Sequence, residues 1–184
     1  MEAIETLKRE HRIVDQVCEA CRLELDRAAE TSDLDPAEVE RFVEFFRFFT
    51  NACHDPKEED LLFTMLHHRG LSWDEDPLAD LVREHEEMRV ILDAADGWVP
   101  HLKRGERSAV RPLCRDLRNY TDLVQAHIDK EEQGIFVIAL EMLSEADHDE
   151  LTLAFENIAC DEGDEGVHQY YSELARELAT YSAS

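Results

Sequence analysis

Residues that break or bend helices are scarce in this chain, which has 6 glycines and 5 prolines among 184 residues. Basic residues are also few: 19 stand against 44 acidic residues, and the formal net charge is −25. Only four of the basic residues are lysines (Lys8, Lys57, Lys103 and Lys130). The first scarcity favours long helices. The second argues against nucleic acid or an anionic membrane as a partner, because a strongly acidic surface repels both.

Long apolar runs and a targeting segment are absent as well. No stretch approaches the roughly 18 consecutive apolar residues of a membrane span. The first residues, Met1 to Glu5, have neither the basic start nor the apolar core of a secretory signal peptide. The cysteines (Cys18, Cys21, Cys53, Cys114 and Cys160) are odd in number, which favours free thiols in a reducing compartment. We therefore expect a cytoplasmic protein, with Cys53 a small buried filler of the core.

Apolar side chains recur every three or four residues along most of the chain, which is the spacing of amphipathic helices. Asp35-Pro36 is a favourable helix start, and Arg69-Gly70 a favourable helix end. The helix that opens at Asp76-Pro77 should end or kink near Pro100. The expected long helices cover about 2–29, 36–68, 77–100 and a segment that starts between 106 and 112. Shorter helices are expected over about 144–159 and 167–181.

These elements predict an all-α fold in which four long helices with short loops form an antiparallel up-down bundle. The bundle would span about residues 2–142, followed by a C-terminal helical extension over about 144–181. The acidic run 161–166 interrupts the extension but is too short to be a linker to a second domain. We therefore expect a single domain, 1–184.

Two copies of the pattern H-x-x-x-E stand out, one from His54 to Glu58 and one from His127 to Glu131. Residues four apart share a helix face, so each copy directs an imidazole and a carboxylate to one point. Histidine with glutamate suits intermediate transition metals such as iron, manganese or zinc. Because both copies lie on the apolar stripe of their helices, they predict a metal site inside the bundle.

His11 and His85 lie on the apolar stripes of the other two long helices. Counting at about 1.5 Å per residue places His11 level with His54, and His85 level with His127. If these histidines were ordinary core residues, two buried carboxylates would lack cations, which costs several kcal/mol each. A dinuclear site removes this difficulty, since six ligands are too many for one tetrahedral ion. Asp15, four residues after His11, is expected to be a solvated acid.

Four stretches together resemble the hemerythrin-like family, also called the HHE cation-binding domain. They are Leu7 to Arg12, Cys53 to Phe63, Arg83 to Arg89 and His127 to Glu132, and the resemblance spans residues 7–136. It implies a four-helix bundle that holds two iron ions in an oxo- or hydroxo-bridged di-iron centre. It further implies His11, His54, His85 and His127 as terminal ligands, with Glu58 and Glu131 as bridging ligands.

One position departs from the pattern of the oxygen-carrying hemerythrins. They have a second histidine four residues after the histidine of the third helix, whereas this chain has Arg89 there. Water, Asp55, Glu86 or His168 would then complete the site. At the end of the second H-x-x-x-E copy we prefer Glu131 over Glu132, because Glu131 reproduces the spacing of the first copy.

The resemblance implies a protein that binds or reacts with O₂ or a related small oxidant, such as peroxide or nitric oxide, in sensing, scavenging or storage. An alternative is an iron-binding module without turnover, whose folding reports the metal level. A purely structural bundle is a third hypothesis. The residues do not select among the oxidants, do not exclude manganese or zinc, and leave any protein partner unknown.

Overall fold

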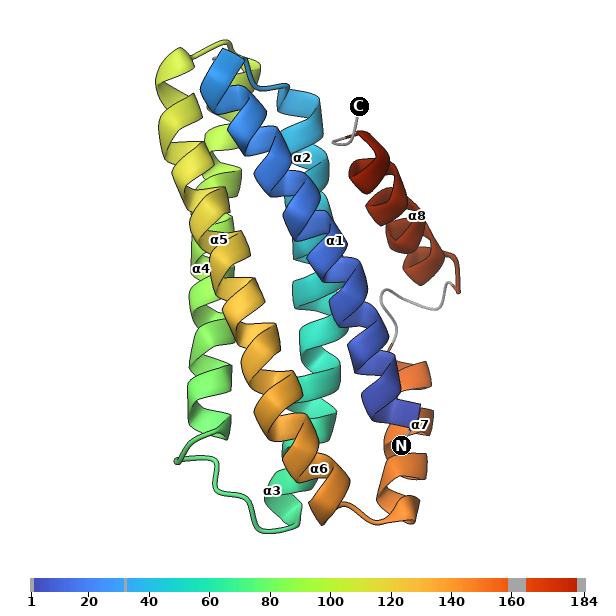
Figure 1. Cartoon of the computed structure of the whole chain (residues 1–184). Coiled ribbons are helices and arrows are strands. Elements are labelled where there is room, and N and C mark those ends of the chain that lie inside the picture. The colour runs from blue at the N-terminus through green and yellow to red at the C-terminus, as the bar shows by residue number, and fades with distance from the viewer. Residues whose placement is uncertain (1, 32, 159–164, 182–184) are drawn as a thin grey trace.

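The computed structural model of the chain describes residues 2–31, 33–158 and 165–181, the last range with side chains from 170 to 180. Within these ranges the ordered elements are helices, and no strand occurs. Four long helical segments run alternately up and down and pack side by side (Figure 1). The prediction of an all-α up-down bundle is confirmed. The segments are α1 (Glu2–Thr31), 36–68, α4 (Leu78–Lys103) and 110–142.

The second and fourth segments contain π-helical stretches. The second consists of α2 (Pro36–Phe45), η1 (Phe46–His54), η2 (Lys57–Phe63) and α3 (Thr64–His68). The fourth consists of α5 (Val110–Lys130), η4 (Glu131–Ile135) and α6 (Phe136–Met142). Both contain wide turns, in which Asp55 N–H donates to the Thr50 carbonyl and Phe136 N–H to the Glu131 carbonyl. Such turns are rare and occur often at functional sites.

The helix ends follow local chemistry. The Asp35 side chain accepts a hydrogen bond from Ala37 N–H at 2.9 Å, and Pro36 occupies the first helical position, as predicted. After α3 the chain turns at Gly70, where φ is +111° and a side chain would be strained. Pro100 does not end its helix, because α4 continues to Lys103. A short 3₁₀ turn, η3 (Arg107–Ala109), precedes α5.

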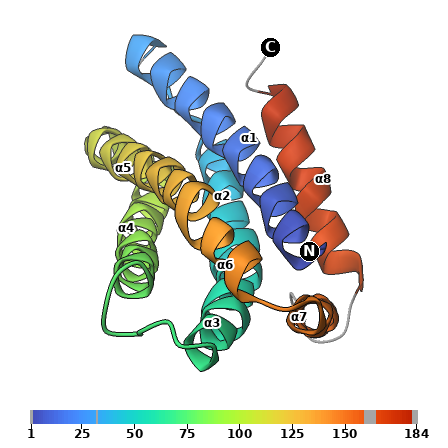
Figure 2. The same cartoon turned by 60° about the horizontal axis from the view of Figure 1, so that its bottom comes forward.

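The C-terminal extension forms two helices, α7 (Glu145–Asn157) and α8 (Glu165–Tyr181). The Ser144 hydroxyl accepts from Asp147 N–H, and Asp147 accepts in return from Ser144 N–H. Figure 2 shows α8 alongside α1, and α7 near the N-terminal end of α1. Both helices add apolar side chains to the clusters described next, so the extension packs on the bundle.

Two apolar clusters fill the bundle, one toward each end. One contains Val14, Phe46, Met88 and Leu117, together with Leu174 of α8. The other contains Leu7, Leu62, Leu81 and Ile135, together with Leu151 of α7. On every long segment the residues between these clusters include the predicted ligands. A polar layer thus lies between two dry regions. No helix among the described residues is long and apolar enough to cross a membrane.

Candidate metal centre

The structure brings together the side chains of all six residues that the sequence predicted as ligands. They come from α1, the η1–η2 region, α4 and the α5–η4 region, and each is at most 4% exposed. They form two groups that share both glutamates, and the candidate ligand atoms in each group lie within 4.8 Å of one another. The groups are His11, His54, Glu58 and Glu131, and Glu58, His85, His127 and Glu131.

The two glutamates lie between the two histidine pairs. Glu58 Oε1 is 3.6 Å from His11 Nε2 and 3.5 Å from His54 Nε2, while its Oε2 is 3.6 Å from His85 Nε2. Glu131 Oε2 is 3.3 Å from His11 Nε2, and its Oε1 is 3.1 Å from His127 Nε2. Each carboxylate therefore faces both groups with different oxygens, as a bridging ligand would.

These inner atoms have no hydrogen-bond partner despite their burial. Both oxygens of Glu58 and of Glu131, and the Nε2 atoms of His11, His85 and His127, make no hydrogen bond. A buried polar group without a partner costs about 1–3 kcal/mol, and a charged one more. Seven such atoms around one point are explained by a group that accepts lone pairs from all of them. Metal cations do this, so the donor set fits a metal centre.

Each histidine also has a glutamate at its outer ring nitrogen, Nδ1. A histidine that donates its Nδ1–H to a carboxylate presents the Nε2 lone pair to the site, which fixes both tautomer and ring orientation. The Nδ1-to-oxygen distances are 3.1 Å for His11–Glu132, 2.9 Å for His54–Glu10, 2.7 Å for His85–Glu59 and 2.9 Å for His127–Glu84.

The two halves of the centre repeat each other in sequence and in contacts. Each half has a Glu-His pair on one helix and a His-x-x-Lys-Glu-Glu run on the next. In one half Lys57 binds Glu10, the glutamate that contacts His54. In the other half Lys130 binds Glu84, which contacts His127. Two of the chain's four lysines therefore neutralise the glutamates that orient site histidines.

The repeat breaks at the residue four positions after the first histidine of each half. In one half this residue is Arg89, which binds Glu59 and lies 3.4 Å from Asp55. In the other half it is Asp15, a partly buried acid whose Oδ1 has no hydrogen-bond partner. Asp15 was predicted to be solvated, and this is wrong: burial, with nearby Glu132 among the contributing charges, raises the pKa of its carboxyl. One half thus carries an extra cation, the other an extra acid.

The sequence matches the hemerythrin HHE cation-binding domain over residues 2–139. The chain belongs to this family. No curated protein and no solved structure gave a match. The match ends inside α6, so it covers all but the last three residues of the bundle and leaves out α7 and α8.

The electrostatics of this hemerythrin-like domain agree with cation binding. Burial opposes a charge on His127, but Glu131 and Glu84 outweigh it and raise the pKa of the imidazole to about 10. Burial and Glu131 together raise the pKa of Glu58. Burial also works against ionised Glu131, yet His127 and His11 hold the pKa of this carboxyl well below its usual range. The negative charge that raises the pKa of His127 also favours a bound cation.

A small cavity of about 10 Å³ adjoins the centre of this hemerythrin-like domain. Histidines from all four long segments line it, together with Asp55, Thr50 and the apolar side chains Val14, Met88 and Val124. A volume of this size holds about one water-sized molecule. The Thr50 hydroxyl is buried without a hydrogen-bond partner, so it can donate to whatever occupies the cavity.

Three protein groups were considered in place of the second histidine that Arg89 replaces, and the structure places them differently. Asp55 is 1% exposed and forms a close group with Glu59 and His85, so it lies at the site. Glu86 is exposed to solvent and lies outside these groups. The side chain of His168 lies outside the described residues. Of the three protein groups considered, Asp55 is the one that the described geometry brings within reach.

The cysteines only partly match expectation. Cys18, Cys21 and Cys114 are free thiols, as predicted. Cys53 is buried, as predicted for a core filler, but it is disulfide-bonded, so the expectation of a free thiol is wrong there. The cysteines therefore no longer support a reducing compartment, and the cytoplasmic location stays a prediction.

Proposed function

We propose that this hemerythrin-like domain binds two iron ions through His11, His54, Glu58, His85, His127 and Glu131, and uses them to bind or react with O₂ or a related small oxidant. The observation that carries the proposal is the set of buried, inward-facing nitrogen and oxygen atoms that have no hydrogen-bond partner. An iron pair held there would supply one-electron redox chemistry and an open position for a small ligand.

The histidines, the glutamates and the apolar residues around them have different roles in the proposed site. Four Nε2 atoms bind as neutral donors, because a glutamate at each Nδ1 holds the ring in the required tautomer. Glu58 and Glu131 span the two halves and balance the charge of the ions. Apolar residues on both sides of the layer exclude bulk water.

Asp55 would complete the half of the centre that lacks a second histidine on α4. Its carboxylate is buried beside His85 and Glu59, and Arg89 binds Glu59 and contacts Asp55 from the outer side. The water-sized cavity next to Asp55 limits the ligand to a small molecule such as O₂, peroxide or nitric oxide. Sensing, scavenging and storage all fit this chemistry.

Metal quantification after anaerobic reconstitution tests the metal assignment. The expected result is close to two iron ions per chain, and a value near zero or a single zinc ion would overturn it. Glu131→Gln should lower the iron stoichiometry. Its neighbour Glu132→Gln is the matched control, and it should keep the stoichiometry while weakening iron affinity by about 10–100-fold.

The oxidant assignment needs a separate measurement. The reduced, iron-loaded protein is mixed in a stopped-flow instrument with O₂, hydrogen peroxide or nitric oxide, and the absorbance change is followed. A rapid, saturable change with at least one of them is expected. Iron loading without any such change would favour the alternative of an iron-binding module without turnover.

A further inference from the structure

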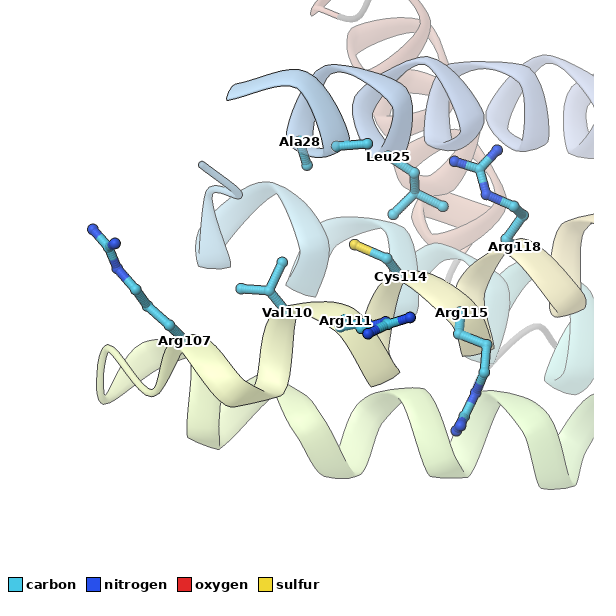
Figure 3. A pocket seen from close by; sticks show the side chains of 9 residues that line it. Leu25, Ala28, Arg107, Val110, Arg111, Cys114, Arg115 and Arg118 are labelled. Atoms are coloured by element: carbon cyan, nitrogen blue, oxygen red, sulfur yellow. The ribbon is translucent and has the colours of Figure 1, made fainter. Parts of the chain in front are cut away.

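The cavity beside the metal centre is small, yet polar groups from different helices converge on it. It holds about 10 Å³, and the Thr50 hydroxyl and the Asp55 carboxylate line it together with four histidines. A wider groove of about 650 Å³ between α1 and α5 is arranged differently. Figure 3 shows Arg107, Arg115 and Arg118 of that groove pointing in three different directions. A few convergent polar groups are what fix the orientation of a bound small molecule, and the cavity at the centre has them.

The Thr50 hydroxyl at this cavity is not used within the described part of the protein. Thr50 is 4% exposed, and its Oγ1 has no hydrogen-bond partner there. A threonine hydroxyl in a helix commonly bonds the carbonyl three or four residues earlier, as Thr121 does with the Arg118 carbonyl at 3.0 Å. Thr50 makes no such bond, so its hydrogen and its lone pairs remain for a molecule in the cavity and for a neighbouring donor.

A second buried hydroxyl lies behind Thr50. Tyr120 of α5 is fully buried, and its phenol oxygen also lacks a hydrogen-bond partner among the described residues. Its ring lies 4.7 Å from the ring of Phe46, which stands four residues before Thr50 on the second segment. Burial raises the pKa of this phenol well above its usual range, and Asp55 and Thr50 are near enough to act on it as well. The phenol is therefore a neutral donor close to the Thr50 oxygen.

We propose that Thr50 selects the ligand of the metal centre: its hydroxyl donates a hydrogen bond to a small anion, such as a peroxide ion. Tyr120 positions Thr50, because a phenol that donates to the Thr50 oxygen leaves the Thr50 hydrogen to point into the cavity. The anion would enter the position that the proposed iron pair leaves open, so this role of Thr50 rests on the proposed function. A charged acceptor gains more from such a bond than a neutral one, so the site should favour peroxide over nitric oxide.

Fluoride is the probe for this donor, because it is a monatomic anion that accepts hydrogen bonds and fits a water-sized cavity. Absorbance titration of the iron-loaded ferric protein measures its affinity. Thr50→Val keeps the shape but removes the hydroxyl, so it should weaken fluoride binding about tenfold, whereas Thr50→Ser should retain it. Nitric oxide binding to the reduced protein should change much less. The matched control Thr121→Val removes a buried threonine hydroxyl outside the cavity and should bind fluoride as the wild type does.

Two further measurements separate this role from a structural one. Tyr120→Phe should weaken fluoride binding in the wild-type background but have no further effect in Thr50→Val, because Tyr120 acts through Thr50. The metal-free protein gives a readout that does not depend on iron. Metal-free Thr50→Val should melt no lower than the metal-free wild type, because it removes a buried hydroxyl that has no partner.

The role of Thr50 is overturned if Thr50→Val binds fluoride like the wild type, or if it melts lower without metal, since its hydroxyl would then be bonded within the protein. Independent, additive losses of fluoride affinity in Thr50→Val and Tyr120→Phe would overturn the positioning role of Tyr120. A wild type that binds two iron ions but no fluoride overturns the role of Thr50 alone. A wild type that binds no iron overturns the proposed function and this role with it.

Discussion

Arg89 and Asp15 occupy equivalent places in the two halves of the metal centre and carry opposite charges. Each lies four residues after a site histidine, Arg89 after His85 and Asp15 after His11. Arg89 binds Glu59, the glutamate at His85 Nδ1, whereas Asp15 lies near Glu132, the glutamate at His11 Nδ1. The positive charge of Arg89 stabilises the carboxylate of Glu59, whereas the carboxyl of Asp15 lies near the like-charged Glu132. The two halves of the repeated scaffold therefore differ in charge.

Arg89→His tests the consequence of this difference for reaction with oxygen. The substitution supplies a nitrogen four residues after His85, on the same helix face. The reduced, iron-loaded wild type should become ferric quickly in air, and Arg89→His should slow this autoxidation. Stopped-flow absorbance after mixing with O₂ measures the rate. Arg89→Gln is the control, since it removes the same cation without adding a ligand; equal rates in the two variants would contradict the prediction.

His54→Ala and His127→Ala should each lower both iron content and thermal stability. Each histidine is buried, and its loss leaves a carboxylate with fewer partners in a site where metal binding is coupled to folding. A loss of about 2 kcal/mol would lower the unfolding midpoint by roughly 4–8 °C in a chain of this size. Calorimetry of each variant beside His68→Ala, an exposed histidine outside the site, provides the comparison. A variant that loses iron but melts at the wild-type temperature would show that the ligands do not stabilise the core.

Lys57→Met should lower the free energy of unfolding by more than Lys130→Met, although each lysine binds a glutamate that contacts a site histidine. The Lys57 side chain is 5% exposed and its partner Glu10 is 3% exposed, whereas the Lys130 side chain is 47% exposed. Removing one partner of a buried pair costs about 3–5 kcal/mol, while exposed pairs contribute about 1 kcal/mol or less. Urea denaturation of both variants in the same metal state measures the difference. Similar losses of unfolding free energy in the two variants would mean that contacts other than Lys57 stabilise the buried Glu10 carboxylate.

Asp147→Asn should destabilise the attachment of α7 at neutral pH. Arg69 and the Ser144 backbone and hydroxyl hold the pKa of the Asp147 carboxyl well below its usual range. A carboxyl whose pKa is lowered in the folded state stabilises the fold at pH values above its ordinary pKa of about 3.9. This stabilisation is lost as the pH falls toward the pKa of the folded state. The difference in melting temperature between wild type and Asp147→Asn should therefore be constant from about pH 7 to 5 and shrink below about pH 4. A difference that grows on acidification would contradict the assignment.

Much of the fold could be predicted from periodicity and helix ends. Three helix boundaries depend on residues close together in sequence, so a short stretch of sequence is enough to predict them. They are the cap at Asp35, the helix end before Gly70 and the start of α7 after Ser144. The π-helical turns around His54 and Glu131 could not, because the turn is selected by packing around the site rather than by a local motif. The helix α4 continues past Pro100 for a similar reason, since Val99 and Leu102 on either side of it are buried in the core.

The inner residues of the centre could be predicted because each H-x-x-x-E copy joins two of them on one helix face. The outer glutamates could not. Glu10 lies beside His11 in sequence, yet it contacts His54 on the neighbouring helix. Glu84 likewise lies beside His85 and contacts His127. Such contacts depend on how the helices pack, which the spacing within one helix does not report.

The polar layer between the two apolar clusters has a consequence for the lifetime of the polypeptide. Each apolar cluster stabilises one end of the bundle by burying apolar side chains. The layer between them contains Glu58 and Glu131, whose mutual repulsion only protons or cations relieve. Iron bound to the folded state alone would shift the opening equilibrium by mass action. Proteases cut chains through such openings, and their rate follows the open population. The rate at which this protein is degraded would then track the supply of iron.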